Sequence, residues 1–161
     1  MGIDVFVLDF LLDCKGRELG DTLCLGRQRF HASLHPATWR RAKAIFAARC
    51  PGTDADTVIQ EDGYSETLFG FLGARSVVSM DISAYEGAEL IHDLNELVGN
   101  ELHNRFDCIF DIGTLEHFYN LPRVMTNIKL MLRAGGMFVS VAPANNFLGH
   151  GLYQLGPKFF W

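Results

Sequence analysis

Short apolar runs alternate with helical patterns along this chain, and this alternation constrains its fold more than any other feature. Five runs are typical of strands, at residues 21–25, 76–80, 88–91, 106–111 and 137–142. Apolar residues recur with helical spacing from Pro36 to the turn at Pro51-Gly52, at 65–72, and most clearly at 121–132. Asn120 is suited to cap the first turn of this last helix, and Gly135-Gly136 would end it before the fifth strand. Strands that alternate with helices predict an α/β fold with a mostly parallel sheet and helices on both faces.

The length and composition indicate one globular domain. The chain has 161 residues, of which 48% are hydrophobic, so it can bury a sizeable core. We expect that core at 20–161, with 1–19 as an N-terminal extension. The net charge of −5 gives no electrostatic reason to expect nucleic acid or an anionic membrane as a partner.

The four cysteines and the N-terminal apolar run bear on the compartment. No CxxC pair is present, so we interpret the cysteines as reduced core residues. Asp4, Asp9 and Asp13 interrupt the N-terminal run, which argues against a signal peptide. The sequence has no stretch of about 18 apolar residues, so no membrane span is predicted. A cytoplasmic protein is therefore expected.

Charged residues follow three of the predicted strands. Asp81 comes after the second strand and Asp93 after the third, while the fourth ends at Asp111 and leads to Glu116 and His117. In open α/β sheets, ligands bind at the carboxyl ends of the strands. The pattern therefore predicts a ligand site at this edge.

These residues stand in motifs that suggest a family. SMDIS at 79–83, HDLN at 92–95, FD at 106–107 with LEH at 115–117, and GGMF at 135–138 follow one another in the chain. Together they resemble a class I S-adenosylmethionine-dependent methyltransferase, which has a Rossmann-like fold. YEGA at 85–88 and GHGLYQ at 149–154 further resemble a little-characterised bacterial subgroup of these enzymes.

The resemblance implies a site for S-adenosylmethionine. Asp81 would accept hydrogen bonds from the ribose diol, with Ile82 beside it. Asp93 would accept from the adenine amino group, and Leu94 would border the ring. The cofactor would also pass near Ile112 and Gly113. Two alternatives stay open: Asp81 would only cap the next turn through Ser83 or Tyr85, and Asp93 would only form an Asx-turn.

The turn after the first strand departs from the family pattern. Of the expected glycine series only Gly26 remains, and Arg27 follows it. We predict that both contact the cofactor and that Arg27 pairs with its carboxylate.

The resemblance also indicates where the methyl acceptor would lie. His117 and His150 are the candidate bases, and Glu116 would orient His117 or the substrate. The expected acceptor is a small molecule or a saccharide, and no metal site is predicted. Alternatively, Glu116 and His117 would only cap the helix that follows.

The C-terminal part sets the remaining expectations. Methyltransferases of this class add two antiparallel edge strands after the fifth strand, and we expect these to be missing from a truncated chain. The aromatic segment at 159–161 suggests a homodimer contact. A noncatalytic binding or assembly protein is the main alternative function. A nicotinamide-dependent enzyme is disfavoured because GxGxxG is absent from the first turn.

Overall fold

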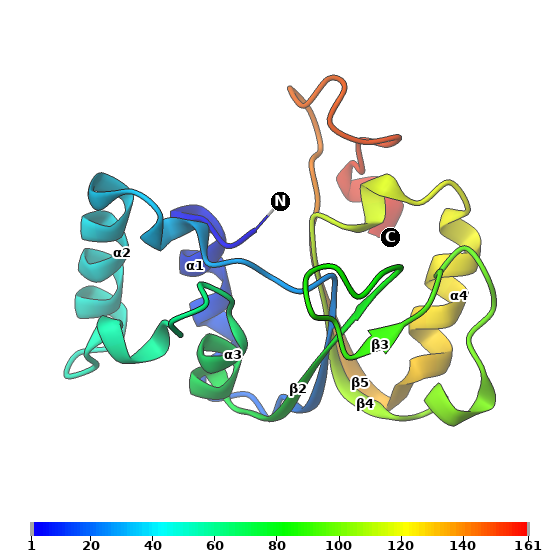
Figure 1. Ribbon diagram of the computed structural model, residues 1–161, viewed down its shortest axis with the longest axis horizontal. Coiled ribbons are helices and arrows are strands. Elements are labelled where there is room, and N and C mark those ends of the chain that lie inside the picture. Colours follow the sequence, from blue (N-terminus) through cyan, green and yellow to red (C-terminus); the bar gives the residue numbers. More distant parts are fainter. Residues whose placement is uncertain (1, 161) are drawn as a thin grey trace.

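A parallel sheet of five strands forms the centre of the molecule (Figure 1). The computed structural model describes residues 2–160. The strands are β1 (Gly20–Leu25), β2 (Ala74–Asp81), β3 (Leu90–Ile91), β4 (Phe106–Ile112) and β5 (Leu132–Val141), in the spatial order β3-β2-β1-β4-β5. Every neighbouring pair is parallel. This order is Rossmann-like, so the predicted α/β fold class is confirmed.

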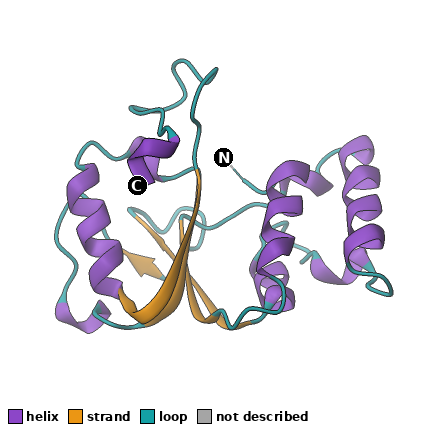
Figure 2. Ribbon diagram, turned by 180° about the vertical axis from the view of Figure 1, so that it is seen from behind, coloured by secondary structure: helices purple, strands orange, loops and turns teal. Residues whose placement is uncertain are grey.

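Helices cover both faces of the sheet (Figures 1 and 2). Helix α4 (Leu121–Met131) packs on one face, while α1 (Val5–Leu11) and α3 (Glu66–Leu72) lie on the other, with α2 (Pro36–Arg49) outside them. Within β1, Cys24 belongs to the apolar cluster on the α1 and α3 side, whereas Leu23 and Leu25 belong to the cluster under α4. The alternation follows from the geometry of a strand, whose successive side chains point to opposite faces.

The predicted strands and helices are all present, with two local differences. β3 has only two residues, Leu90 and Ile91, where four were expected. Glu89 precedes it, and its carboxylate accepts hydrogen bonds from the backbone and side chain of Ser79, each at 2.7 Å. Gly135 and Gly136 were expected to end the last helix, but that is wrong, since α4 ends at Met131 and β5 begins at Leu132.

The two glycines instead form an irregularity within β5. Gly135 has φ +82°, and the register between β4 and β5 shifts at this point. A Cβ atom on Gly136 would lie 3.0 Å from the carbonyl oxygen of Asp107, which is closer than ordinary contact. Glycine is therefore needed so that the two strands can approach each other.

The N-terminal segment, expected to be an extension, packs into the apolar cluster on the α1 and α3 side. Ile3, Leu8, Leu11 and Leu19 are fully buried. The carboxylate of Asp4 caps α1 by accepting hydrogen bonds from two backbone N–H groups at 2.9 Å. Asp9 and Asp13 of the same segment form ion pairs with Arg49 of α2. These contacts hold the segment against the rest of the domain.

The residues after β5 form a loop that projects beyond the sheet and a short 3₁₀ helix at Pro157–Phe160 (Figure 1). Residues 142–160 contain no further strand. Phe159 and Phe160 are partly exposed and pack edge to face, while Trp161 lies outside the described residues. Dimerisation through this segment stays a prediction. Among the helices described, none combines the length and apolar character needed to cross a membrane. All four cysteines are free and buried, as predicted.

Candidate functional site

A pocket of about 270 Å³ opens at the carboxyl edge of the sheet, beyond the ends of β2, β3 and β4. Three predicted cofactor residues, Asp81, Ile82 and Leu94, line it together with the predicted catalytic residue His117. The other lining residues are Met80, His92, Asn95, Thr114 and Phe118. The predicted ligand edge of the sheet therefore carries a pocket.

Gly26 lies beside this pocket in the turn after β1. Its φ is +72°, and its N–H donates to the carbonyl of Met80 at 2.8 Å. A Cβ atom here would lie 3.2 Å from Thr114 Oγ1 and 4.0 Å from Asp81 Oδ2. Strand β1 pairs with β2 on one side and β4 on the other, so Gly26 lies at the point where the strand order reverses. Such points bind ligands in open α/β sheets.

The carboxylate of Asp81 has one engaged oxygen and one free oxygen. Oδ1 accepts a hydrogen bond from the N–H of Ser83 at 3.2 Å, which is the turn-capping contact anticipated as an alternative. Within residues 2–160, no hydrogen-bond donor reaches Oδ2, which lies toward Gly26. Capping the turn therefore leaves Asp81 able to accept further hydrogen bonds from a ligand.

Asp93 forms an Asx-turn. Its Oδ1 accepts hydrogen bonds from the backbone N–H and the side-chain amide of Asn95, both at 2.9 Å. Asp93 does not line the pocket, whereas Asn95 and Leu94 do. The turn formed by Asp93 therefore places Leu94 and Asn95 at the pocket.

Ile112 and Gly113 also lie outside the pocket lining. Ile112 is fully buried in the apolar cluster under α1 and α3. Gly113 has φ +76° and donates its N–H to the carbonyl of Val141 at 2.9 Å. The next residue, Thr114, lines the pocket instead, and its hydroxyl donates to the carbonyl of Leu25 at 2.8 Å.

Arg27 is held by partners within the protein. Its guanidinium forms ion pairs with Glu66 at 2.7 Å and Asp62 at 2.8 Å, and it donates to the carbonyl of Glu86 at 3.2 Å. It also stacks over Tyr64, with 3.8 Å between the guanidinium carbon and the ring centroid. Glu66 and Asp62 raise the pKa of Arg27 further. These contacts tie the turn after β1 to α3, so a bound carboxylate would have to displace an existing partner.

Asp111 is held by the protein interior, although it lies near the carboxyl end of its strand as Asp81 does. It is fully buried, and its carboxylate accepts hydrogen bonds from the N–H groups of Thr114 and Leu115, both at 3.0 Å, and from the hydroxyl of Ser140 at 2.6 Å. Burial raises the pKa of Asp111 to about 6, against the lowering effect of these hydrogen bonds. Asp111 thus shapes the loop after β4 from inside.

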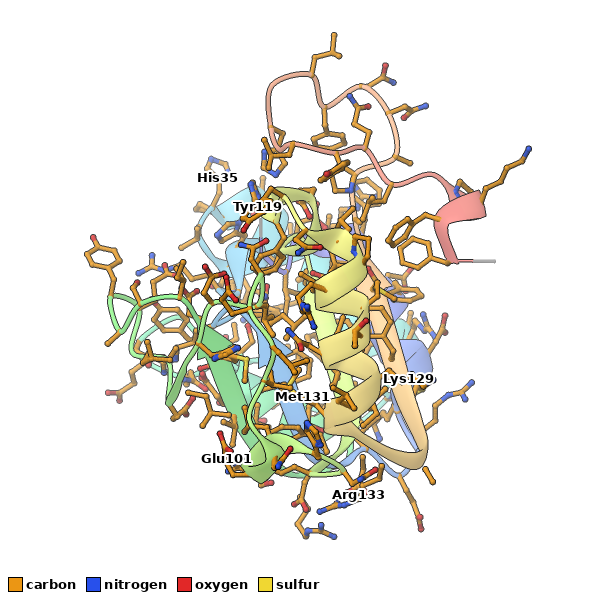
Figure 3. All side chains as sticks on the ribbon, turned by 90° about the vertical axis from the view of Figure 1, so that its right-hand side faces the viewer. His35, Glu101, Tyr119, Lys129, Met131 and Arg133 are labelled. Carbon is orange, nitrogen blue, oxygen red and sulfur yellow. The ribbon has the colours of Figure 1, made fainter. Side chains whose placement is uncertain are left out.

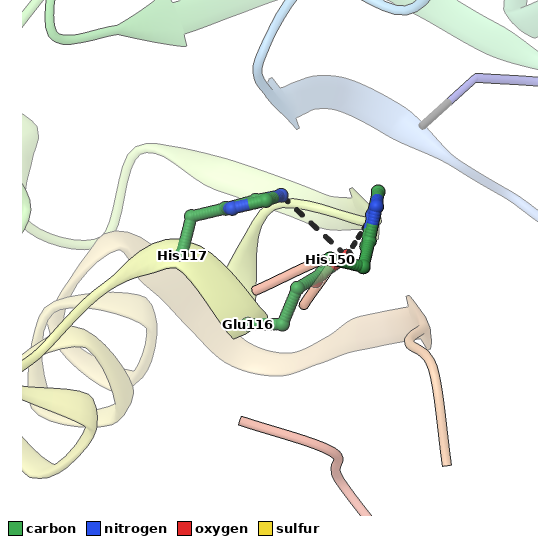
Figure 4. Close-up of side chains that lie close together, drawn as sticks. All are labelled: Glu116, His117 and His150. Carbon is green, nitrogen blue, oxygen red and sulfur yellow. Dashed lines mark ion pairs between the residues drawn. The ribbon is translucent and has the colours of Figure 1, made fainter. Parts of the chain in front are cut away.

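The three predicted catalytic residues come together in space (Figure 4). Glu116 and His117 belong to a 3₁₀ helix at Leu115–His117, and His150 comes from the loop after β5. Glu116 Oε1 lies 3.4 Å from Nε2 of His150 and 3.8 Å from Nε2 of His117. Hereafter these side chains are called the Glu-His-His cluster.

Backbone contacts hold the loop after β5 against Glu116. The carbonyl of Glu116 accepts hydrogen bonds from the N–H groups of Leu152 at 2.7 Å and Tyr153 at 3.2 Å. A Cβ atom on Gly151 would lie 2.7 Å from Cγ of Glu116, so only glycine allows this approach. The neighbouring residue His150 is thereby placed over the Glu116 side chain.

The Glu116 carboxylate is fully buried, and neither of its oxygens accepts a hydrogen bond within the described part of the chain. The side chains of His117 and His150 are 47% and 34% exposed. Helix α4 is capped by Asn120, whose side chain accepts from the N–H of Arg123 at 3.3 Å. The alternative that Glu116 and His117 cap this helix is therefore wrong, and their side chains are available for other contacts.

Sequence reasoning missed five of the lining residues: Met80, His92, Asn95, Thr114 and Phe118. Asn95 stands within the HDLN motif, so its polar amide was a usable signal. Thr114 follows Gly113 at the end of the fourth strand, but nothing in the sequence distinguishes its hydroxyl from that of any other loop threonine.

A larger cavity of about 510 Å³ lies at the opposite, amino edge of the sheet. Figure 3 shows the two ends of α4, with Tyr119 near the carboxyl edge and Arg133 near the amino edge. Arg133 and Arg75 form ion pairs with Asp21 and Asp107 there, which hold the pKa values of both aspartates below their usual range. Since these charges satisfy one another and no candidate site residue lies nearby, the cavity is not a functional candidate.

No protein-family model and no curated protein matches this sequence. The case for a function therefore depends on the pocket and on the Glu-His-His cluster themselves.

Proposed function

We propose that this protein is an S-adenosylmethionine-dependent methyltransferase that acts on a small-molecule or saccharide-type acceptor by in-line transfer. The observation that carries the proposal is the free Oδ2 of Asp81, which lies at a pocket where the strand order reverses. A carboxylate in that place is suited to accept hydrogen bonds from the vicinal hydroxyls of a ribose.

The pocket fits the adenosyl half of this cofactor better than the whole. Its volume of about 270 Å³ lies near the lower limit of about 300 Å³ for small-molecule sites. Asp81 would hold the ribose, and the apolar side chains of Ile82, which is 64% exposed, and Leu94 would border the base. Asn95 adds an amide at the same wall.

The methionine half would extend along the turn after β1. Gly26 supports this path, because any side chain at that position would crowd Thr114 and approach Asp81. Arg27 supports it less, since its donors are occupied by Glu66, Asp62 and Glu86. We therefore assign Arg27 to shaping the turn and Gly26 to keeping it open.

The acceptor would approach from the side of the Glu-His-His cluster. His117 lines the pocket and also belongs to the cluster, so it connects the two. When bound, S-adenosylmethionine supplies a methyl group activated by a sulfonium, and correct positioning accounts for much of the rate. A hydroxyl acceptor also loses a proton, which His117 or His150 can take, with Glu116 orienting the imidazoles.

Calorimetric titration with S-adenosylmethionine tests this proposal. We expect binding by the wild type and a loss of affinity of about 10- to 100-fold in Asp81→Asn, because hydrogen bonds to a charged group contribute about 1.5–3 kcal/mol. The asparagine can still cap the turn at Ser83, so the fold is preserved. Asp56→Asn is the matched control, since it removes an exposed carboxylate that pairs with Lys43 on the α2 side.

Two results would refute the proposal. One is the absence of binding by the wild type at millimolar cofactor, and the other is unchanged affinity in Asp81→Asn. Normal binding in Asp56→Asn together with loss in Asp81→Asn supports it.

A noncatalytic binding protein is the second candidate, and the engagement of Arg27 favours it. If the turn after β1 no longer receives the methionine half, the pocket would bind a nucleoside without methyl transfer. Titration with adenosine distinguishes the two. A methyltransferase binds S-adenosylmethionine more tightly than adenosine, whereas a nucleoside-binding protein binds both equally.

A further inference from the structure

The geometry points to a divalent metal site of the zinc class, formed by Glu116, His117 and His150. This inference goes beyond the proposed function and does not depend on cofactor binding at Asp81. It assigns Nε2 of His117 and His150 as ligand atoms in place of the proton-accepting role given above, because a ring nitrogen that binds a metal cannot also take a proton. Each residue offers one ligand atom, and the three atoms lie within 4.8 Å of one another. The sequence predicted no metal here because the three residues are not spaced as a recognisable ligand motif.

The distances agree with shared coordination. Two ligand atoms about 2.0–2.1 Å from a tetrahedral ion lie about 3.3 Å apart. Glu116 Oε1 lies 3.4 Å from Nε2 of His150 and 3.8 Å from Nε2 of His117, as the dashed lines in Figure 4 mark. Small rotations of the two imidazoles would bring all three atoms to one ion.

The buried carboxylate of Glu116 is the second, independent observation. It is inaccessible to solvent, and neither of its oxygens accepts a hydrogen bond from any group in residues 2–160. A buried carboxylate that accepts no hydrogen bond is costly, so such groups are normally hydrogen-bonded to a charged partner or bound to a metal. The atoms nearest to this carboxylate are Nε2 of His117 and Nε2 of His150. Imidazole nitrogens and carboxylate oxygens are both common ligands of zinc.

The ligand set also indicates the kind of site. Two histidines and one glutamate are a ligand combination of catalytic zinc sites, which keep a further coordination position open. The imidazoles are 47% and 34% exposed, so the open position would face solvent beside the pocket. An oxygen ligand of a small molecule, such as a hydroxyl or carboxylate, is the class that would occupy it.

The supporting structure is built to hold these ligands in place. Hydrogen bonds from Leu152 and Tyr153 to the carbonyl of Glu116 fix the loop, and Gly151 allows its close approach. The imidazole rings of His117 and His150 lie 5.2 Å apart between centroids, inclined at 65°. No thiol competes for the ion, because the four cysteines are buried elsewhere.

Metal titration tests this site directly. Untagged protein is stripped with a chelator and titrated with Zn²⁺ against a chromogenic competitor, and with Co²⁺ followed by visible absorption. We expect one ion per chain in the wild type. Glu116→Gln and His150→Ala should each weaken binding by more than about 100-fold, because even supporting residues of metal sites contribute about 10- to 100-fold.

His35→Asn is the matched control, since it removes an exposed imidazole and leaves an acceptor for the cap of α2. It should bind as the wild type does. Thermal unfolding without metal shows whether each variant is folded, and Glu116→Gln is expected to fold because glutamine has nearly the same volume. Zn²⁺ should raise the Tm of the wild type but not that of Glu116→Gln.

Absence of stoichiometric binding by the folded wild type overturns the inference. Equal binding by the wild type and Glu116→Gln also overturns it. The same samples are also titrated with S-adenosylmethionine, so that failure of the metal site and failure of the proposed function can be told apart. The proposed function fails only if the cofactor does not bind at Asp81, whatever the result with Zn²⁺.

Discussion

Replacing Asp111 with asparagine is expected to change how the stability of the protein depends on pH. The folded protein holds this carboxyl group at a pKa of about 6 because of burial, compared with an ordinary value of 3.8. Between these values the folded state binds a proton that the unfolded chain does not. The contribution of Asp111 to stability therefore falls as the pH rises through this range and is constant above it.

The magnitude follows from the difference between the two pKa values. One pKa unit corresponds to 1.36 kcal/mol, so the whole range amounts to about 3 kcal/mol, of which about 2 kcal/mol falls between about pH 4.5 and 7.5. In Asp111→Asn the amide oxygen can still accept from the N–H groups of Thr114 and Leu115, and its NH₂ can donate to Ser140. The variant should therefore gain about 2 kcal/mol relative to the wild type over this pH interval.

Urea unfolding at several pH values, with a chelator present, measures this difference. The control is Asp107→Asn, because the ion pair with Arg133 lowers the pKa of Asp107 and places its titration below the interval. Its difference from the wild type should stay constant. If the difference between Asp111→Asn and the wild type is also constant from about pH 4.5 to 7.5, the assignment of Asp111 as a desolvated structural carboxyl is refuted.

Two further predictions concern residues that hold the segments next to the pocket in place. Asn127→Ala should lower the free energy of unfolding by about 3 kcal/mol, because this buried side chain makes three hydrogen bonds to the backbone of the segment 94–98. Urea unfolding measures this loss, and a decrease of less than about 1 kcal/mol would contradict the prediction. Arg27→Lys should cost about 1 kcal/mol, since lysine cannot reproduce the forked contact with Glu66, yet it should change S-adenosylmethionine affinity less than Asp81→Asn does. A larger loss of affinity in Arg27→Lys, measured by the same calorimetry, would indicate direct pairing with the cofactor.

The secondary structure was predictable because it depends on local spacing. In α4, the apolar residues Leu121, Val124, Ile128 and Met131 recur every three or four positions, and all are buried. In β4, the continuous apolar run predicts burial on both faces, which the two apolar clusters confirm. The end of α4 was not predictable from local pattern. Gly135 and Gly136 resemble a turn that ends a helix, but Gly136 instead allows β5 to pack closely against β4, and this contact depends on a distant part of the chain.

The roles of the strand-end acids required the tertiary structure. Asp81 and Asp111 both stand at the carboxyl end of a predicted strand, so the sequence presents them alike. In the folded protein, Asp111 is buried and satisfied by three hydrogen bonds, whereas Asp81 keeps one oxygen free at the pocket. The partners of Arg27 also required the tertiary structure, because they come from α3 and the segment before it.

The sequence by itself determined the α/β class, the order of strands and helices along the chain, and the edge of the sheet where a ligand would bind. It named Glu116 as a carboxylate that would orient His117 or the substrate, and His150 as an independent candidate base. Only the tertiary structure brought His150 to Glu116, 34 positions away in the chain, because the loop after β5 folds back onto the carbonyl of Glu116. Periodicity records the short-range preferences of a chain, whereas a cluster built from two distant loops depends on how the whole domain packs.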